Sequence, residues 1–299
     1  MECVMCMTKK IYALGFFDGV HLGHQALLTA CCRMAGEKGC ETAAITFDRH
    51  PQALFTEQPP KLISTVADRE MLLRRYGIQN VRILPVTKEV MGICWTDFLE
   101  KLLQDGAAGF VCGDDFRFGN HGEGDHRKLE AFCRERGLPC VIVPQQEQEG
   151  IRISSTRIRE ALENGALDRA NALLGHPYTL TGQVVSGRQL GRTIGIPTAN
   201  LQFPGALLTP AFGVYACKAW VEGKAHLAVT NIGNRPTVGG HWITVEPWLL
   251  DFHGDLYGKT LILEFFAFLR PERKFQDLQA LRLEILKNAE ETRKIFGNS

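Results

Sequence analysis

The chain has 299 residues, which is long for one domain and enough for two domains that each bury their own core. Its 34 lysine and arginine residues balance 33 aspartate and glutamate residues, and the formal charge of +1 excludes a global basic field that would recruit nucleic acid or an anionic membrane. No stretch approaches the ~20 apolar residues of a membrane span, so we expect a cytoplasmic protein.

Short β-rich runs alternate with helical patterns from residue 11 to about residue 172. The expected strands are 11–14, 42–47, 80–84, 108–112 and 139–143, and the expected helices are 22–36, 66–76, 96–104, 126–137 and 156–163. This alternation is typical of a Rossmann-like, doubly wound parallel sheet, an α/β fold. Ligands bind such sheets at the carboxyl ends of the strands, where the polar motifs of this half fall.

The pattern changes after Gly175. Glycine-rich turns separate the β-rich segments 178–186, 213–221, 226–231, 242–252 and 260–268. Their spacing predicts a small closed antiparallel barrel, an all-β fold, and residues 275–296 read as an amphipathic C-terminal helix that packs on it. We therefore divide the chain into a first domain of residues 1–174 and a second of residues 175–299.

The segment GFFDGVHLGH, residues 15–24, directly follows the first expected strand. A strand that breaks here and restarts as a helix aims backbone amides and a helix dipole at one place, a usual reception site for phosphate. The strand would break at Gly15, and the helix would begin near Leu22. His21 and His24 would share one face of the first helical turn, which favours phosphate chemistry; a capped surface helix with solvated histidines is the alternative.

The segment ISSTRIREAL, residues 153–162, follows the last expected strand of this half. Ser154, Ser155 and Thr156 are good helix starters, and Arg159 adds positive charge where a helix N-terminus already favours anions. Alone, the segment reads as a capped helix with solvated arginines. The ordered pair of HxGH and ISSTxxR resembles the nucleotidyltransferase superfamily, whose members release pyrophosphate.

The second half has its own phosphate-binding pattern, GRQLGRTIGIPTANL at residues 187–201. Thr198 and Asn200 lie two residues apart on an extended chain, so their neutral oxygens point to one side and suit a magnesium ion that bridges nucleotide phosphates. The alternative is a glycine-rich hairpin with turn-forming Thr and Asn. The other residues of interest in this loop are Gly187, Arg188, Gly191 and Gly195.

Glu246 interrupts an otherwise apolar β run within ITVEPWLLDFHGDLYGK, residues 243–259. An acid at such a position is costly unless it has a task or a partner, so it is a candidate catalytic group. A surface-facing residue on a half-exposed strand is the alternative.

The ten cysteines are scattered through apolar stretches, so we interpret most as small buried hydrophobes kept reduced. Examples are Cys94, Cys112, Cys133, Cys140 and Cys217. Cys3 and Cys6 form a CxxC, but no second CxxC completes four zinc ligands. A zinc site there stays the minor alternative.

With the motifs of both halves in order, the chain resembles the family of bifunctional prokaryotic riboflavin kinases and FMN adenylyltransferases, or FAD synthetases. The resemblance runs from Lys10 to Phe296. In the first half it rests on GFFDGVHLGH, TFDRHP, GDDFRFG and SSTRIR, and in the second on GRQLGRTIGIPTANL, NIGNRPT, TVE and DFHGDLYGK. It implies that the barrel phosphorylates riboflavin with ATP to FMN, and that the first domain adenylylates FMN to FAD and releases pyrophosphate.

For adenylyl transfer, the resemblance implies that His21 and His24 stabilise charge on the α-phosphate of ATP. The residues that would hold ATP with them are Gly15, Phe16, Asp18, Gly19, Ser154, Ser155, Thr156 and Arg159, the last also as a catalytic group. Those that would place FMN are Asp48, His50, Pro51, Asp114, Asp115, Phe116 and Asn120.

For the kinase, the resemblance implies that Glu246 is the catalytic base and that Thr198 and Asn200 hold Mg²⁺ and ATP. The other ATP-binding residues would be Gly187, Arg188, Gly191 and Gly195. The flavin would contact Asn231, Arg235, Glu246, Leu256, Tyr257 and Arg270. We expect only small-molecule partners, and a monomer or weak homo-oligomer.

Three alternative functions fit the sequence less well. A nucleotidyltransferase for pantetheine phosphate or nicotinamide mononucleotide fits the first half but predicts no kinase motif. A flavin-binding regulator without turnover would have lost His24 or Glu246, and both are present. A nucleic-acid-binding barrel needs a basic groove with exposed aromatics, which the balanced charge does not favour.

Overall fold

The computed structural model describes residues 8–187, 191, 194–237 and 240–297, and within these the side chains of residues 235–237 and 240–242 are not described. The chain forms two compact units. The first comprises Met1–Leu62 and Arg69–Ser154, and the second comprises Ile63–Asp68 and Ser155–Ser299. A short segment from the N-terminal half of the sequence therefore belongs to the second unit.

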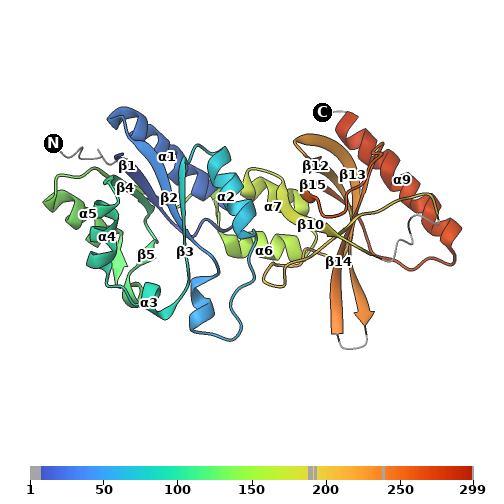
Figure 1. Cartoon of the computed structure of the whole chain (residues 1–299), viewed down its shortest axis with the longest axis horizontal. Coiled ribbons are helices and arrows are strands. Elements are labelled where there is room, and N and C mark those ends of the chain that lie inside the picture. The colour runs from blue at the N-terminus through green and yellow to red at the C-terminus, as the bar shows by residue number, and fades with distance from the viewer. Residues whose placement is uncertain (1–7, 188–190, 192–193, 238–239, 298–299) are drawn as a thin grey trace. The chain divides into compact units, whose positions relative to one another are not determined.

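The first unit is built on a five-stranded parallel sheet, which confirms the expected α/β fold (Figure 1). In spatial order its strands are β3 (Asn80–Leu84), β2 (Glu41–Phe47), β1 (Lys10–Leu14), β4 (Ala107–Gly113) and β7 (Cys140–Val143). Each strand starts and ends within one residue of its expected limits. The order reverses between β1 and β4, which is the position where sheets of this kind bind ligands.

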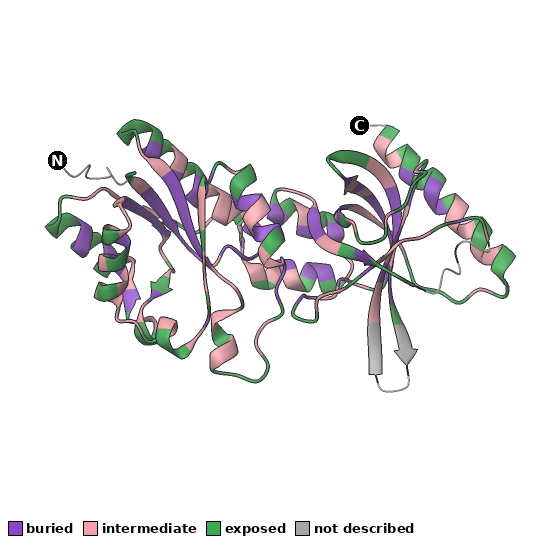
Figure 2. Ribbon diagram, in the orientation of Figure 1, coloured by how far each residue is buried: buried purple, intermediate pink, exposed green. Residues whose placement is uncertain are grey.

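Helices cover both faces of this sheet, and the strands between them are largely buried (Figure 2). One face carries α1 (Leu22–Lys38) and α2 (Val66–Arg75), and the other carries α4 (Trp95–Gln104) and α5 (His126–Glu135). Side chains of β1 alternate between the two cores: Ile11 packs towards α1, whereas Tyr12 packs towards α4 and α5.

Several short elements of the first unit were not expected from the sequence. They are α3 (Lys88–Met91), the strand pair β5 (Arg117–Phe118) and β6 (Gly124–Asp125), the pair β8 (Glu147–Gln148) and β9 (Ile151–Arg152), and the 3-10 turns η1 (Asp18–Val20), η2 (Pro51–Leu54) and η3 (Asn120–Gly122). They lie in the loops that join the main strands and helices. Elements of two to four residues are too short to show a period.

The second unit contains a closed antiparallel barrel, as expected. In spatial order its strands are β10 (Tyr178–Val185), β11 (Asn200–Leu201), β14 (Gly240–Leu249), β13 (Lys224–Thr237), β12 (Gly213–Val221) and β15 (Thr260–Pro271). The C-terminal helix α9 (Leu278–Gly297) packs on β12 and β13, where Ala289 joins a buried cluster with Val214 and Val229.

Two further helices pack in the second unit, α6 (Ser155–Glu163) and α7 (Leu167–Leu174). The sequence division at residue 174 placed both in the first domain. Asn171 of α7 holds the barrel by two hydrogen bonds: its Nδ2 donates to the Phe265 carbonyl at 2.9 Å, and its Oδ1 accepts from the Tyr178 amide at 2.7 Å. The helices thus pack with the strands that follow them rather than with the parallel sheet.

The described cysteines are free thiols, in line with the expectation of reduced residues. Cys112, Cys133 and Cys217 are buried, while Cys94 and Cys140 are half-buried. The CxxC at Cys3 and Cys6 lies outside the described residues. Among the helices in the described part of the chain, none has the length and apolar character to cross a membrane.

Candidate functional sites

The segment after β1 forms a strained turn. Phe17, Gly19 and Val20 have positive φ angles of 58°, 76° and 41°, and both non-glycine residues are fully buried. Positive φ is uncommon for phenylalanine and a genuine outlier for a β-branched valine. Such conformations persist only where their surroundings fix them, and they cluster at ligand and catalytic sites.

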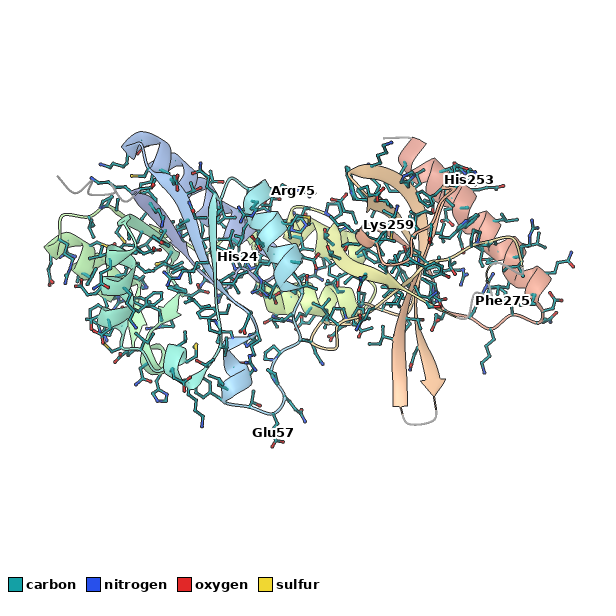
Figure 3. The ribbon with its side chains drawn as sticks, in the orientation of Figure 1. His24, Glu57, Arg75, His253, Lys259 and Phe275 are labelled. Carbon is teal, nitrogen blue, oxygen red and sulfur yellow. The ribbon has the colours of Figure 1, made fainter. Side chains whose placement is uncertain are left out.

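The turn delivers two histidines to the start of α1 (His24 is labelled in Figure 3). The His21 Nδ1 accepts a hydrogen bond from the His24 amide at 3.3 Å, which makes His21 the cap of the helix. The two rings stack with their centroids 3.7 Å apart. Phe17 packs edge-on against the His24 ring at 5.2 Å. The sequence-predicted pair is thus brought together in one stack.

The environment of His24 keeps its imidazole neutral near pH 7. Burial, then the adjacent His21 and the charge of Arg69, lower the pKa of His24 well below its ordinary value. The His24 Nδ1 is enclosed and has no hydrogen-bond partner among the described residues. A neutral imidazole keeps one N–H group, which can donate a hydrogen bond to a phosphate oxygen.

A cavity of about 390 Å³ lies at this edge of the sheet. Its size suits a small organic ligand, and its lining is mainly apolar. Three sequence-predicted residues line it: Gly15, Pro51 and Phe116. Other lining residues were missed because an apolar residue in the sequence cannot be told from an ordinary core residue; they include Phe47, Leu84, Val90, Met91, Ile93, Phe98 and Phe118.

Two of the acidic residues predicted for this site have structural partners. Asp48 Oδ1 accepts a hydrogen bond from the Val86 amide at 2.9 Å and so fixes the loop after β3. Asp115 forms an ion pair with Arg152 at 2.7 Å, and both side chains are exposed. Neither residue lines the cavity.

The remaining predicted residues of this group differ in their surroundings. Asp114 follows β4, and its Oδ1 is enclosed without a hydrogen-bond partner in the described part of the chain. His50 caps η2 and lies edge-on to Phe16, with centroids 5.2 Å apart. Asn120 is exposed at the start of η3.

The ISSTRIR motif lies where the two compact units divide. Ser154 ends the first unit, and α6 of the second unit begins at Ser155. Thr156 is exposed and Arg159 is half-buried on this helix. The expected helix start is therefore present, with its hydroxyl residues at the N-terminus as the sequence indicated.

The barrel unit contains a cavity of about 340 Å³ between its strands and α9. Glu246 of β14 lines this cavity and lies directly opposite Asn231 of β13 in the strand register. Arg270 of β15 also lines it. One side is apolar and comprises Val214, Val229, Trp248, Phe275, Leu278, Leu281 and Ile285. A pocket with an apolar side and a few convergent polar groups is typical of small-molecule sites.

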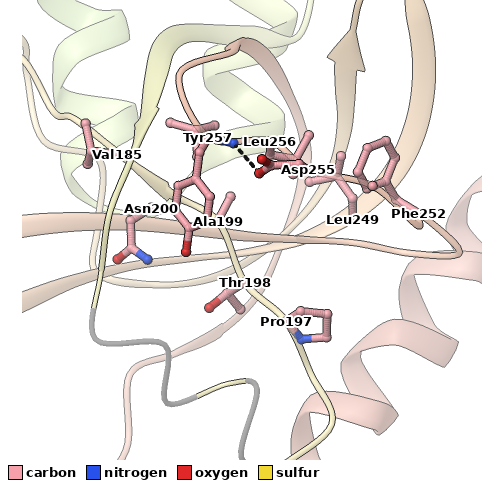
Figure 4. A pocket seen from close by; sticks show the side chains of 12 residues that line it. Val185, Pro197, Thr198, Ala199, Asn200, Leu249, Phe252, Asp255, Leu256 and Tyr257 are labelled. Carbon is pink, nitrogen blue, oxygen red and sulfur yellow. Dashed lines mark hydrogen bonds between the residues drawn. The ribbon is translucent and has the colours of Figure 1, made fainter.

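A smaller pocket of about 80 Å³ lies next to it (Figure 4). Thr198 and Asn200 line both this pocket and the larger cavity. Leu256 and Tyr257, expected at the flavin, line the smaller pocket, and the Tyr257 amide donates to Asp255 Oδ1 at 3.0 Å. The Thr198 hydroxyl and the Asn200 side-chain amide, both singled out in the sequence, therefore lie between two adjoining pockets.

Arg270 is held in place by α9. Its Nε donates to Asn288 Oδ1 at 3.1 Å and lies 3.4 Å from Glu284 Oε1. Glu284 also pairs with Arg273 at 2.5 Å. Arg273 and Asn288 line the larger cavity with Arg270, and neither was singled out in the sequence. The C-terminal helix thus builds the site as well as covering the barrel.

Glycines of the 187–201 loop allow close approach. A Cβ atom at Gly187 would overlap the Asn200 amide, and one at Gly191 would overlap the Ile196 carbonyl oxygen. Gly195 has a positive φ of 72°. Arg188 and the side chain of Arg235, both predicted to bind substrate, lie outside the described residues.

Comparisons with known proteins match each half of the chain to a family model. A family model described as FAD synthetase matches residues 4–157, and one described as riboflavin kinase matches residues 174–296. The bifunctional riboflavin kinase/FMN adenylyltransferase of Listeria monocytogenes is 36% identical over 293 residues, covering 97% of this chain and 93% of its own. Its counterpart in Escherichia coli K12 is 34% identical over 291 residues, covering 96% and 93%.

The fold also matches a solved structure along nearly the whole chain. That crystal structure, described as a macrolide-efflux protein from Streptococcus pneumoniae, gives a TM-score of 0.84 at 30% identity. The match covers 96% of this chain and 94% of the other.

Proposed function

Since the chain belongs to the family of bifunctional riboflavin kinases/FMN adenylyltransferases, we propose which residues carry each of its two reactions. The protein phosphorylates riboflavin with ATP to FMN in its C-terminal part and adenylylates FMN with ATP to FAD and pyrophosphate in its N-terminal part. Both reactions transfer a phosphorus group between oxygens, so catalysis is mainly positioning and charge neutralisation.

For adenylyl transfer, we place the α-phosphate of ATP at the turn after β1. The FMN phosphate oxygen attacks this phosphorus while the bond to the departing pyrophosphate breaks. Negative charge grows on the oxygens in transit, where the amides at the start of α1 and the stacked His21 and His24 can meet it. A neutral His24 enters this contact without repelling His21.

Ser154, Ser155, Thr156 and Arg159 are proposed to hold the β- and γ-phosphates that leave as pyrophosphate. Hydroxyl groups and amides at a helix start bind phosphate oxygens, and the planar guanidinium of Arg159 can pair with two oxygens at once. Asp18 and Gly19 are proposed to shape the turn that receives the α-phosphate.

The flavin of FMN is proposed to occupy the 390 Å³ cavity of the first unit. Phe47, Phe98, Phe116 and Phe118 offer aromatic surface for a planar ring system. Asp114 has an enclosed oxygen that can accept a hydrogen bond from the ligand. His50, Pro51 and Asn120 stay in the proposed FMN site, and Asp48 and Asp115 shape it through Val86 and Arg152.

For the kinase, we place riboflavin in the 340 Å³ cavity and the phosphates of ATP in the adjoining pocket. The single observation that carries this assignment is that Thr198 and Asn200 line both spaces, so a γ-phosphate at their side chains faces the flavin cavity. Glu246 lies in that cavity, where its carboxylate can orient the ribityl hydroxyl and accept its proton as the hydroxyl attacks.

The donor set at the shared edge suits magnesium. Thr198 supplies a hydroxyl oxygen and Asn200 an amide oxygen, and the carboxylate of Asp255 lines the same pocket. These are the hard oxygen ligands that Mg²⁺ accepts beside phosphate oxygens and water. When bound, the ion would neutralise phosphate charge and align the β- and γ-phosphates.

The cellular location and the partners of the enzyme can be inferred from its substrates and its charge. We propose that it works in the cytoplasm, where ATP is the phosphate donor, and as a monomer or weak homo-oligomer. A balanced net charge of +1 gives no reason to expect a nucleic-acid or membrane partner.

One assay tests both assignments: protein, riboflavin, ATP and Mg²⁺ are incubated, and the flavins are separated. His24→Asn should stop at FMN, and Glu246→Gln should make FAD only from added FMN. Glu264→Gln is the matched control, because Glu264 is also a mid-strand barrel glutamate but hydrogen-bonds to Trp220 at 2.9 Å away from the cavity. FAD formation by His24→Asn at the parent rate would show that the nucleotide binds elsewhere.

A further inference from the structure

Arg69 is fully buried, and it is the largest of the fully buried side chains among the described residues. It lies on α2, outside every motif identified in the sequence. Burying a guanidinium is costly unless hydrogen bonds and nearby groups compensate the loss of water. A buried arginine therefore indicates a specific task in this unit.

Arg69 links the end of β2 to the turn after β1. Its Nη1 donates hydrogen bonds to Thr46 Oγ1 at 3.0 Å and to the Phe47 carbonyl at 2.7 Å. Thr46 Oγ1 in turn donates to the Phe16 carbonyl at 2.6 Å. The guanidinium carbon lies 4.6 Å from the centre of the Phe16 ring. Arg69 thus holds Phe16 through both its backbone and its side chain.

Phe16 lies between the cavity and the histidine pair along the chain. Gly15 before it lines the 390 Å³ cavity, and the turn after it, in which Phe17, Gly19 and Val20 have positive φ, leads directly to His21. A strained turn keeps its shape only if neighbouring groups fix it. Moving Phe16 would shift the amides and the histidine pair together.

We propose that Arg69 is a positioning residue for adenylyl transfer, which fixes the turn at Phe16 from inside the core and so holds the histidine pair that follows it in place. This inference rests on the proposed nucleotide site at that turn.

The charge of Arg69 has a separate effect from its hydrogen bonds. Together with burial and with His21, it lowers the pKa of His24. The buried carboxylate of Asp18 lies in the same turn, so the groups around the pair include both signs of charge. Removing the guanidinium should raise the pKa of His24, whereas removing only a hydrogen-bonding partner should not.

Four variants separate these effects in the full-length protein. Arg69→Met removes charge and hydrogen bonds, Arg69→Lys keeps the charge, and Thr46→Val removes the relay hydroxyl only. Arg74→Met is the matched control, because Arg74 is exposed on the same helix and pairs with Glu70. The measurements are kcat and KM for FMN adenylylation across pH, the riboflavin kinase rate of the same sample, and the pKa of His24 by NMR.

We expect Arg69→Met to lower kcat by about tenfold to hundredfold with little change in KM, since small displacements of catalytic groups have effects of this order. Its His24 pKa should rise. Thr46→Val should lower kcat with the His24 pKa unchanged, and Arg69→Lys should restore that pKa and part of kcat. The kinase rate and Arg74→Met should stay at the parent values.

A parental kcat in Arg69→Met or an equal loss in Arg74→Met would overturn the inference. If Arg69→Met does not fold, parental kcat in both Arg69→Lys and Thr46→Val would overturn it instead. His24→Asn distinguishes the two levels: unchanged FAD formation refutes the nucleotide site itself, whereas loss of FAD formation with a neutral Arg69→Met refutes only the role of Arg69.

Discussion

At the scale of single residues, the histidine pair could be predicted from the sequence, whereas the role of Arg69 could not. The spacing of His21 and His24 predicted a shared helix face, and the rings do stack at 3.7 Å. Arg69 could not be predicted, because the sequence does not show that α2 directs this side chain into the core towards Thr46. Charged residues on helices usually face water, so nothing in the sequence distinguishes Arg69 from a solvated surface arginine.

The lowered pKa of His24 predicts acid sensitivity of the first unit. Its folded pKa lies below the unfolded value of about 6.5, so the unfolded chain binds more protons once the pH falls below that value. Stability from neutral His24 is therefore complete above about pH 6.5 and is lost as the pH drops towards the folded pKa. Thermal unfolding of the first unit at pH 7.5 and pH 5.5 should show a smaller decrease for His24→Asn than for the parent.

The comparison needs a control substitution at another histidine. His253→Asn is suitable because His253 is exposed and belongs to the second unit (Figure 3). It should leave the pH dependence of the first unit unchanged. An identical pH dependence in the parent and His24→Asn would contradict a neutral, buried imidazole.

At the scale of elements, period and turn signals identified the main strands and helices, since these are long enough to show which face is buried. The same signals identified the glycine-rich loop at residues 187–201, but they did not show why glycine is required there. Gly187 has no unusual φ; it is needed because Asn200 approaches its Cα closely. Close approach between two loop positions is a property of the folded chain and has no local pattern.

Gly187→Ala should therefore displace Asn200 and lower riboflavin kinase activity by about tenfold or more, since the added methyl group moves a proposed ligand of the phosphates. FMN adenylylation should not change. Gly205→Ala is the matched control, because a Cβ there meets no atom within 4 Å. Kinase activity of Gly187→Ala equal to that of Gly205→Ala would rule out this explanation.

Asn171→Ala tests the attachment of α7 to the barrel. The substitution leaves the Phe265 carbonyl and the Tyr178 amide without their side-chain partner, which should lower the free energy of unfolding of the second unit by about 1–3 kcal/mol. Denaturation followed by the fluorescence of Trp220 and Trp248 measures it. Asn164→Ala, at an exposed position at the end of α6, should change little; equal effects would mean that the two hydrogen bonds contribute nothing.

At the scale of the whole molecule, the order of two folds could be predicted, but the assignment of α6 and α7 to a unit could not. Helical periodicity shows that Ile158 and Leu173 face a core, yet it does not show which sheet supplies that core. The same holds for Ile63, which is buried in the second unit although its neighbours in sequence build the first. These pairings are long-range and have no signal in a single sequence.

Fragments test this division. A fragment of residues 155–299 should retain riboflavin kinase activity, whereas one of residues 175–299 should unfold at lower denaturant concentration because it lacks α6 and α7. The longer fragment should still be less stable than the second unit of the intact chain, since it lacks Ile63–Asp68. Equal midpoints for both fragments and the intact chain would argue against any contribution of these segments.

Asp68 shows how the segment Ile63–Asp68 affects the order in which the chain folds. Its carboxylate is buried in the second unit, where hydrogen bonds from Thr65 and Thr181 partly offset the burial that raises its pKa. During translation, the segment Ile63–Asp68 leaves the ribosome well before β10 is made. It therefore cannot pack against the barrel until the barrel strands have been synthesised. The second unit is therefore completed only after its last strand is made, by residues that were synthesised much earlier.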